Sequence, residues 1–209
     1  MKKYILAAGS LLFLSGLVIV MGISTAEALY PATYVTSKNV ISDLGGPALS
    51  TGITYQPSAA IFNWSMILTG LMVIAAYFFL FRAKVSIKRI FPIGIMGLGI
   101  LGAGAFPLHV NSLHLFFSVI VFIFGGISLI FSSGISSIKS FRVITTLLGI
   151  VSLCASILDA FFPNFIYPIL GRGGIERWIV YPIIAWLCIF GGYLIGDAEF
   201  SPKLQLDKK

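Results

Sequence analysis

The chain has 209 residues, of which 58% are hydrophobic and only 10% are charged, and its mean hydropathy is +1.02. Soluble domains carry about 25% charged residues, so this composition excludes a soluble globular protein and indicates an integral membrane protein. The length predicts one membrane domain over residues 1–209. The formal net charge of +7 does not indicate a nucleic-acid partner, because the basic residues lie in short segments between apolar runs.

Six apolar runs follow one another along the chain, and each is long enough for a membrane helix, which needs about 20 such residues. The pattern therefore predicts an all-α bundle of six transmembrane helices. The third run is rich in glycine, which predicts close contact with its neighbours. A loop rich in proline and glycine is expected over residues 163–177. The predicted helices are residues 4–26, 58–81, 90–106, 110–138, 143–162 and 178–196.

The first run allows two interpretations. It follows Lys2-Lys3 and ends near Ala26-Glu27-Ala28, which resembles a secretory signal with a small-residue cleavage site. The apolar core of such a signal is about 7–15 residues long, and this run is longer. We therefore expect it to be retained as the first membrane helix.

The basic residues are distributed unequally between alternate loops and ends, which predicts the orientation of the bundle. Eleven lie on one side and three on the other, so both termini are expected in the cytoplasm and the first, third and fifth loops outside it. The first set is Lys2, Lys3, Arg82, Lys84, Lys88, Arg89, Lys139, Arg142, Lys203, Lys208 and Lys209, and the second is Lys38, Arg172 and Arg177.

The loop between the first two helices, residues 29–57, is the longest polar interval of the chain. Its apolar residues and low charge are not typical of disorder, and loops of this length are usually functional. Asp43 precedes Gly45-Gly46-Pro47, a sequence that forces a tight turn. We therefore predict a structured outer loop in which Asp43 accepts hydrogen bonds from nearby amides.

The predicted topology places most of the unusual polar residues on the outer side, where ionisable groups at the edge of a span favour a functional role. The expected ligand-binding or structural residues are Ser42, Asp43, Gly45, Asn63, His109, Arg172, Glu176 and Arg177. The catalytic candidates are His114, Ser118 and Asp159.

The catalytic hypothesis depends on spacing. His114 and Ser118 lie one turn apart and share a helix face, and Asp159 or Asp43 would orient the imidazole of an activated serine. No nucleophile-elbow glycines surround Ser118, so the favoured alternative is that this hydroxyl bonds to its own helix and the histidine lies at the interface.

A metal site would need His109 and His114 with the two aspartates, but no metal-binding motif is present. Neither a metal nor another cofactor is predicted.

The outer arginines support a third hypothesis. Arg177 or Arg172 would pair with Asp43, Asp159 or Glu176 and hold the loop against the bundle without any ligand. The same groups are suited to a phosphate head group, because arginine binds phosphate through two parallel hydrogen bonds.

Six short segments stand out along the chain: Ile41-Ser42-Asp43-Leu44-Gly45, Ile61-Phe62-Asn63, Leu68-Thr69-Gly70, Gly104-Ala105-Phe106-Pro107, His114-x-x-x-Ser118 and Gly174-Ile175-Glu176-Arg177. Together they resemble a known family of prokaryotic membrane proteins, filed as domain of unknown function 998. The resemblance covers most of the chain and implies a shared fold, without an assigned activity.

More distantly, the Ile-Ser-Asp-x-Gly stretch is similar to the Frag1/DRAM/Sfk1 membrane proteins, a group associated with lipid-anchor remodelling, lipid organisation and autophagy regulation. Leu44 stands where those proteins usually carry threonine.

Two classes of function follow from these observations. The favoured expectation is a multi-pass protein of the plasma membrane that binds or organises lipid, or a partner protein, through its outer face. The alternative is a membrane-embedded hydrolase or transferase that acts on a lipid head group or acyl bond at that face.

Overall fold

The computed structural model describes residues 1–31, 33–47, 52–107 and 111–200. Within these residues it contains six long α-helices, all of them long and apolar enough to cross a membrane, and a single isolated β-bridge between Pro47 and Thr54. The predicted all-α, six-helix membrane fold is therefore confirmed. The helices are α1 (Lys2–Ala28), α2 (Ser58–Arg82), α3 (Ile87–Ala105), α4 (Asn111–Ser133), α5 (Lys139–Phe161) and α6 (Pro163–Phe200).

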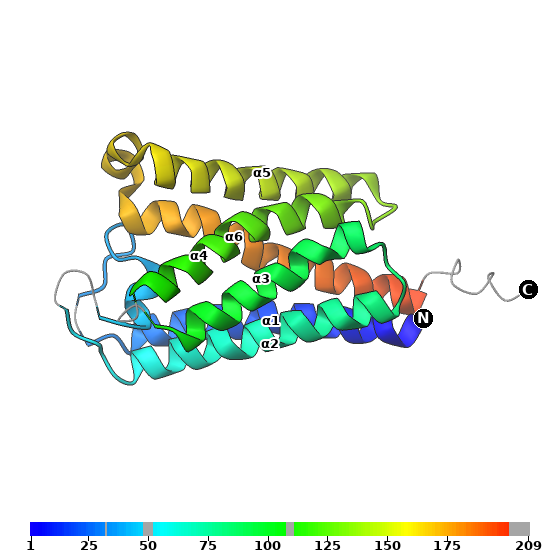
Figure 1. Ribbon diagram of the computed structural model, residues 1–209, viewed down its shortest axis with the longest axis horizontal. Coiled ribbons are helices and arrows are strands. Elements are labelled where there is room, and N and C mark those ends of the chain that lie inside the picture. Colours follow the sequence, from blue (N-terminus) through cyan, green and yellow to red (C-terminus); the bar gives the residue numbers. More distant parts are fainter. Residues whose placement is uncertain (32, 48–51, 108–110, 201–209) are drawn as a thin grey trace, which may run out of the picture.

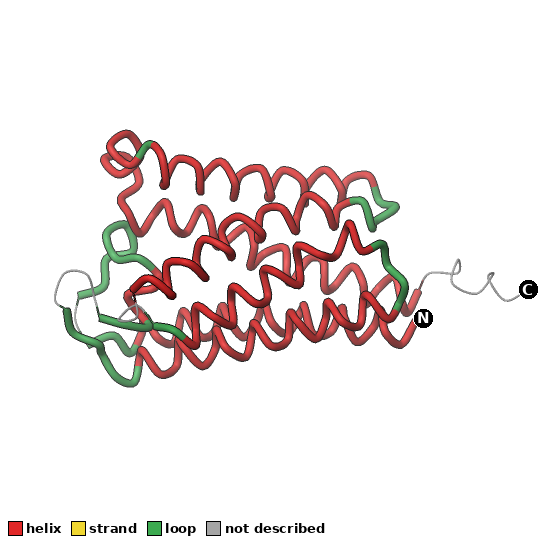
Figure 2. Tube along the Cα trace, viewed as in Figure 1, coloured by secondary structure: helices red, strands yellow, loops and turns green. Residues whose placement is uncertain are grey.

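The helices run up and down in chain order and form a closed ring. Each packs against its neighbours in sequence, α6 packs against α1 to complete the ring, and α4 also contacts α6 across the interior (Figure 1). The loop over residues 29–57, which we call the cap, lies at one end, the capped end. The start of α1 and the end of α6 lie at the opposite end (Figures 1 and 2).

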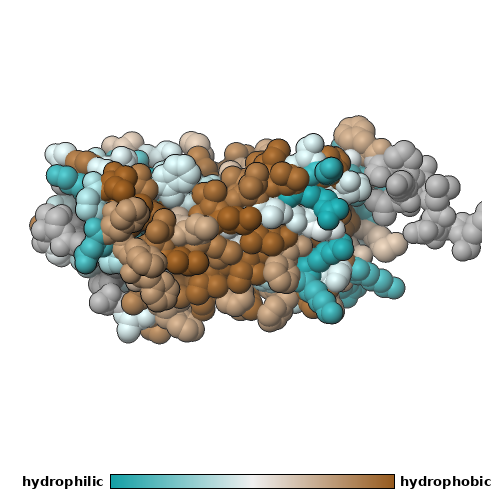
Figure 3. Space-filling model, turned by 90° about the horizontal axis from the view of Figure 1, so that it is seen from above, coloured by the Kyte–Doolittle hydropathy of each residue, from teal (hydrophilic) through white to brown (hydrophobic). Residues whose placement is uncertain are grey.

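The surface shows why this bundle belongs in a membrane. Large apolar side chains such as Leu71, Phe78, Leu98 and Phe161 are exposed on the outside of the ring. Figure 3 shows an apolar band across the middle of the molecule, with hydrophilic residues at both ends. Such a band would be unfavourable in water and is stable against lipid.

Glycines in α3 allow its two neighbours to approach closely. A Cβ atom on Gly104 would lie 2.9 Å from the carbonyl oxygen of Asn63 in α2, and one on Gly99 would lie 3.1 Å from the carbonyl oxygen of Phe117 in α4. Helices in lipid gain little from burying apolar area and depend on this kind of close packing.

Several helix boundaries differ from the sequence prediction. Helix α4 ends at Ser133 rather than at residue 138, and α5 begins at Lys139 rather than at residue 143. The predicted loop over residues 163–177 is wrong: these residues are helical and belong to α6, with a break at Gly171, where φ is 73° and ψ is 164°. A proline at position 163 starts the helix, since its missing N–H is not needed in the first turn.

The described residues of the cap are folded, as the composition of residues 29–57 predicts. Its centre is a short 3₁₀ helix, Ile41–Leu44, whose apolar residues are buried. They pack with Ile23 and Ala26 of α1, Phe62 of α2 and Ile184 of α6. The 3₁₀ helix therefore closes the ring at its capped end.

Candidate functional site

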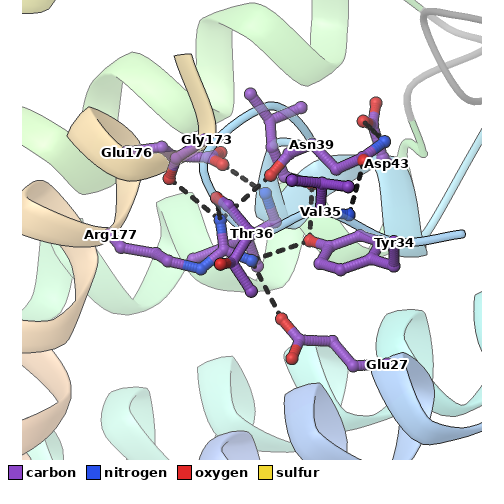
Figure 4. Close-up of polar contacts among 11 residues, drawn as sticks. Glu27, Tyr34, Val35, Thr36, Asn39, Asp43, Gly173, Glu176 and Arg177 are labelled. Carbon is purple, nitrogen blue, oxygen red and sulfur yellow. Dashed lines mark hydrogen bonds and ion pairs between the residues drawn. The ribbon is translucent and has the colours of Figure 1, made fainter. Parts of the chain in front are cut away.

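Arg177 of α6 joins the cap to the bundle (Figure 4). Its Nη1 donates hydrogen bonds to the carbonyl oxygens of Thr36 (2.7 Å), Asn39 (2.9 Å) and Gly173 (2.9 Å). Its Nη2 donates to Glu27 and to the Tyr34 hydroxyl, both at 2.9 Å. A planar guanidinium with fixed donors is suited to so many acceptors at once, and this arrangement holds one conformation of the cap.

The acidic partner of Arg177 is Glu27 at the end of α1, a residue that the sequence marks only as part of a cleavage-like motif. The ion pair is 2.9 Å long, with the arginine side chain 10% exposed and the glutamate 26% exposed. None of the acids proposed from the sequence is the partner in this ion pair. The sequence feature that identifies Glu27 is its position: it is the last charged residue of the first membrane helix and lies next to the start of the cap.

Tyr34 also links Arg177 to the cap through hydrogen bonds. Its hydroxyl accepts from Arg177 and donates to the carbonyl oxygen of Val40 at 3.0 Å. Burial raises the pKa of Tyr34, while the neighbouring arginine opposes this shift. The hydroxyl therefore remains a proton donor at neutral pH.

Two glycines of α6 make room for the cap. Gly171 has a positive φ of 73°, which favours glycine, and a Cβ atom there would collide with the carbonyl oxygen of Ser37. The N–H of Gly173 donates to that same carbonyl at 3.0 Å. The break in α6 is thus the place where cap backbone and helix backbone meet.

Asp43 lies inside the cap and is 3% exposed. Its Oδ2 accepts a hydrogen bond of 3.1 Å from the side-chain amide of Asn39, whose Oδ1 accepts from the N–H of Val35 at 3.0 Å. Since the carbonyl of Asn39 also binds Arg177, this aspartate supports the segment that the arginine holds.

Two further residues singled out from the sequence, Gly45 and Asn63, contact each other. The side-chain amide of Asn63 donates to the carbonyl oxygen of Gly45 at 2.7 Å. A Cβ atom at this glycine would collide with Asn63 and with the ring of Phe62. These contacts connect the cap to the first turns of α2.

A cavity of about 70 Å³ lies in the ring beneath the 3₁₀ helix of the cap. Every helix except α5 contributes to its wall, which is mostly aliphatic and aromatic. The polar residues of the wall are Ser42, Thr69, His114, Ser118 and Glu176.

Glu176 and His114 are held in place by backbone groups. One carboxylate oxygen of Glu176 accepts a hydrogen bond from the N–H of Ile41 in the cap. Nδ1 of His114 lies 2.9 Å from the carbonyl oxygen of Phe106 and 3.2 Å from that of Ala103. Both neighbours are acceptors, so this nitrogen carries the proton, and Nε2 of the neutral ring is an acceptor.

The structure brings together part of the predicted site. Ser42, His114, Ser118 and Glu176 share the cavity wall. Asp159 lies apart from that wall and accepts a hydrogen bond of 3.1 Å from the Tyr167 hydroxyl. Arg172 is exposed, and His109 lies outside the described residues.

No group of three histidine, cysteine, aspartate or glutamate side chains in the described part of the chain is placed to hold a metal ion.

The cavity wall combines acceptor groups with apolar surface: a carboxylate, an imidazole nitrogen and three hydroxyls lie among isoleucine, valine and phenylalanine side chains. The described wall residues include neither lysine nor arginine.

The comparisons with known proteins give one match. The family model described as "Protein of unknown function (DUF998)" matches residues 13–193. No curated protein and no solved structure matches the chain. The matched range includes most of α1, the cap and the cavity wall, and this multi-pass membrane protein belongs to the DUF998 family.

Proposed function

We propose that this protein binds a membrane lipid at its capped end, with the polar group of the lipid in the cavity beneath the cap. The observation that carries the proposal is the wall of this cavity, where Glu176, His114 and Ser118 are surrounded by apolar side chains. Sites for small molecules are of this type, mostly apolar with a few polar groups that fix orientation. We place the protein in the plasma membrane, with the capped end outside the cytoplasm.

The chemistry of the wall selects the class of lipid. A phosphate group would need cationic partners, but Arg177 is engaged by the cap and Arg172 is not part of the wall. The carboxylate of Glu176 and Nε2 of His114 are hydrogen-bond acceptors. They favour a lipid that donates hydrogen bonds, so we propose a hydroxyl- or amine-bearing lipid without an anionic head group, such as a monoacylglycerol.

The test is native mass spectrometry of the protein released from the membrane in mild detergent. The wild type should carry a lipid adduct whose fragments identify a hydroxyl- or amine-bearing lipid. Glu176→Gln retains an oxygen that accepts from the N–H of Ile41 but replaces the other carboxyl oxygen by an NH₂ group, which cannot accept a hydrogen bond from the lipid. It should lower occupancy about tenfold, because the loss of one buried hydrogen bond costs about 1.4 kcal/mol.

Asp159→Asn is the matched control, since this carboxylate near the end of α5 is not part of the cavity wall and the amide oxygen can still accept from the Tyr167 hydroxyl. It should leave lipid occupancy unchanged. A wild-type protein without any lipid adduct, or equal occupancy in both variants, would refute the proposal.

The same residues support a second candidate function, a hydrolase or transferase acting on a lipid ester. His114 holds its proton on Nδ1, which leaves Nε2 available as a base, and Ser118 lies one turn away in the same wall. The Ser118 hydroxyl makes no hydrogen bond to any described residue. Labelling with a fluorophosphonate separates the two candidates: covalent modification of Ser118, lost in Ser118→Ala and His114→Gln, would favour the enzyme.

A further inference from the structure

The cavity is too small for the lipid that the proposed function requires. A cavity of about 150 Å³ holds a benzene molecule, whereas this one measures about 70 Å³. It has room for a terminal hydroxyl or amine of a head group but not for an acyl chain. The chain of a bound lipid must therefore lie in a neighbouring space that connects to the cavity.

Two surface grooves lined by described residues lie beside α6. They share Tyr181 and Ala185, and only one of them meets the cavity. The groove between α1 and α6 has a volume of about 420 Å³ and shares two wall residues with the cavity, Ile23 and Ile184. The groove between α5 and α6 measures about 510 Å³ and shares none. Ile23 and Ile184 are 5% and 7% exposed, so their side chains form the shared wall between the first groove and the cavity. A lipid reaches from one space into the other when these two side chains move apart.

The α1–α6 groove has the composition expected for an acyl chain. Its hydroxyl-bearing residues, Ser24 and Tyr181, lie nearer the capped end, and Val20, Ala185 and Cys188 line the part nearer the middle of the bundle. A lipid with its head group beneath the cap and its chain along this groove would place its polar groups against polar side chains. Its acyl chain would lie against apolar side chains.

We propose that the α1–α6 groove is the acyl-chain site of this protein, and that a single-chain, hydroxyl-bearing lipid passes between Ile23 and Ile184 to place its head group in the cavity. This inference rests on the proposed function and adds the route and the position of the chain. It also predicts a preference for single-chain lipids, because the groove and the cavity meet at only two residues.

The probe is a monopalmitoylglycerol with a diazirine at the end of its acyl chain, added to the full-length protein in lipid nanodiscs. After irradiation, adducts should map to peptides containing Val20 or Cys188. Val20→Trp fills the groove without adding volume to the cavity, because Val20 lines only the groove. It should lower the adduct yield about tenfold, a change of the size expected when a well-packed apolar contact is lost.

Leu17→Trp is the matched control. Leu17 lies on the same helix and is 43% exposed, compared with 41% for Val20, but it is not a residue of the groove wall. The control should keep its adduct yield within about twofold of the wild type, a difference below 1 kcal/mol. Equal yields in the two tryptophan variants would overturn the proposal.

The native thiols provide a second measurement that needs no substitution. Cys188 lines the groove, and Cys154 is exposed on α5 away from it. Unmodified monopalmitoylglycerol should slow N-ethylmaleimide labelling of Cys188 and leave labelling of Cys154 unchanged. Equal protection of both thiols, or of neither, counts against the groove.

The outcomes also separate this inference from the proposed function. If native mass spectrometry shows bound monopalmitoylglycerol but the adducts map to Leu148 or Trp178 in the α5–α6 groove, the acyl-chain site is wrong and the head-group cavity stands. If the wild type binds no lipid at all, the proposed function fails and this inference fails with it.

Discussion

Arg177 determines how the cap is attached, because one side chain serves acceptors from three segments of the chain: the cap, α1 and the helix of the arginine itself. Lysine keeps the charge but lacks the planar fork of donors. Arg177→Lys should therefore lose two or three hydrogen bonds and lower stability by about 2–4 kcal/mol, at about 1 kcal/mol each with an added cost for the buried acceptors left unpaired. The measurement is the thermal unfolding midpoint in detergent, followed by tryptophan fluorescence.

Arg172→Lys is the control for that substitution, since Arg172 is exposed. Its unfolding midpoint should equal that of the wild type. Equal midpoints for Arg177→Lys and the wild type would show that the contacts of Arg177 do not hold the cap.

Two neighbouring tyrosines of the cap give opposite predictions for the same chemical change. The Tyr34 hydroxyl bonds to Arg177 and Val40, whereas the buried Tyr30 hydroxyl has no hydrogen-bond partner among the described residues. Tyr34→Phe should destabilise the protein by about 1–3 kcal/mol. Tyr30→Phe should be neutral or stabilising, because it removes an unpaired polar group from an apolar cluster. A destabilising Tyr30→Phe substitution would contradict this account.

The buried carboxylate of Asp43 contributes to the stability of the cap. Because its carboxylate accepts from Asn39, which in turn binds Arg177, Asp43→Ala should lower the unfolding midpoint and make the cap more sensitive to protease. Asp43→Asn should be milder, since its amide oxygen still accepts. If Asp43→Ala leaves stability and proteolysis unchanged but removes a co-purifying lipid, Asp43 belongs to the lipid site instead.

At the scale of the elements, the break in α6 is the feature that joins helix and cap. Gly171→Ala should destabilise the capped end by about 1–3 kcal/mol, because alanine is strained at a positive φ and its Cβ would collide with Ser37. Gly196→Ala in the same helix meets nothing within 4 Å and should be neutral or stabilising by up to about 1 kcal/mol. Hydrogen exchange of the cap amides, together with the unfolding midpoint, distinguishes the two variants.

At the scale of the whole molecule, the orientation predicted from the basic residues can be tested directly. A reporter that is active only in the cytoplasm should be active when fused after Lys139 and inactive when fused at Lys38 in the cap, because basic loops stay on the cytoplasmic side. Activity at Lys38 would reverse the orientation and place the capped end and its cavity in the cytoplasm.

The sequence by itself determined the membrane class, the six spans and the presence of a structured cap. The physical reason is that lipid requires each crossing segment to satisfy its own backbone hydrogen bonds within an apolar helix of sufficient length. Each crossing segment must meet this requirement separately, so the hydropathy of the sequence alone identifies the membrane helices. The sequence also pointed to one end of the bundle, where Asp43, Gly45, Asn63 and Arg177 all form contacts of the cap.

Only the tertiary structure decided which of these residues meet. Glu27 and Arg177 form their ion pair across a sequence separation of 150 residues, and Glu176 rather than Asp159 shares a cavity with His114. Adjacent residues such as Glu176 and Arg177 have similar sequence signals, yet one faces the cavity and the other binds the cap, because successive helical positions point in different directions. Ring closure between α1 and α6 creates both the cavity and the groove beside it, and no local pattern in the chain encodes that closure.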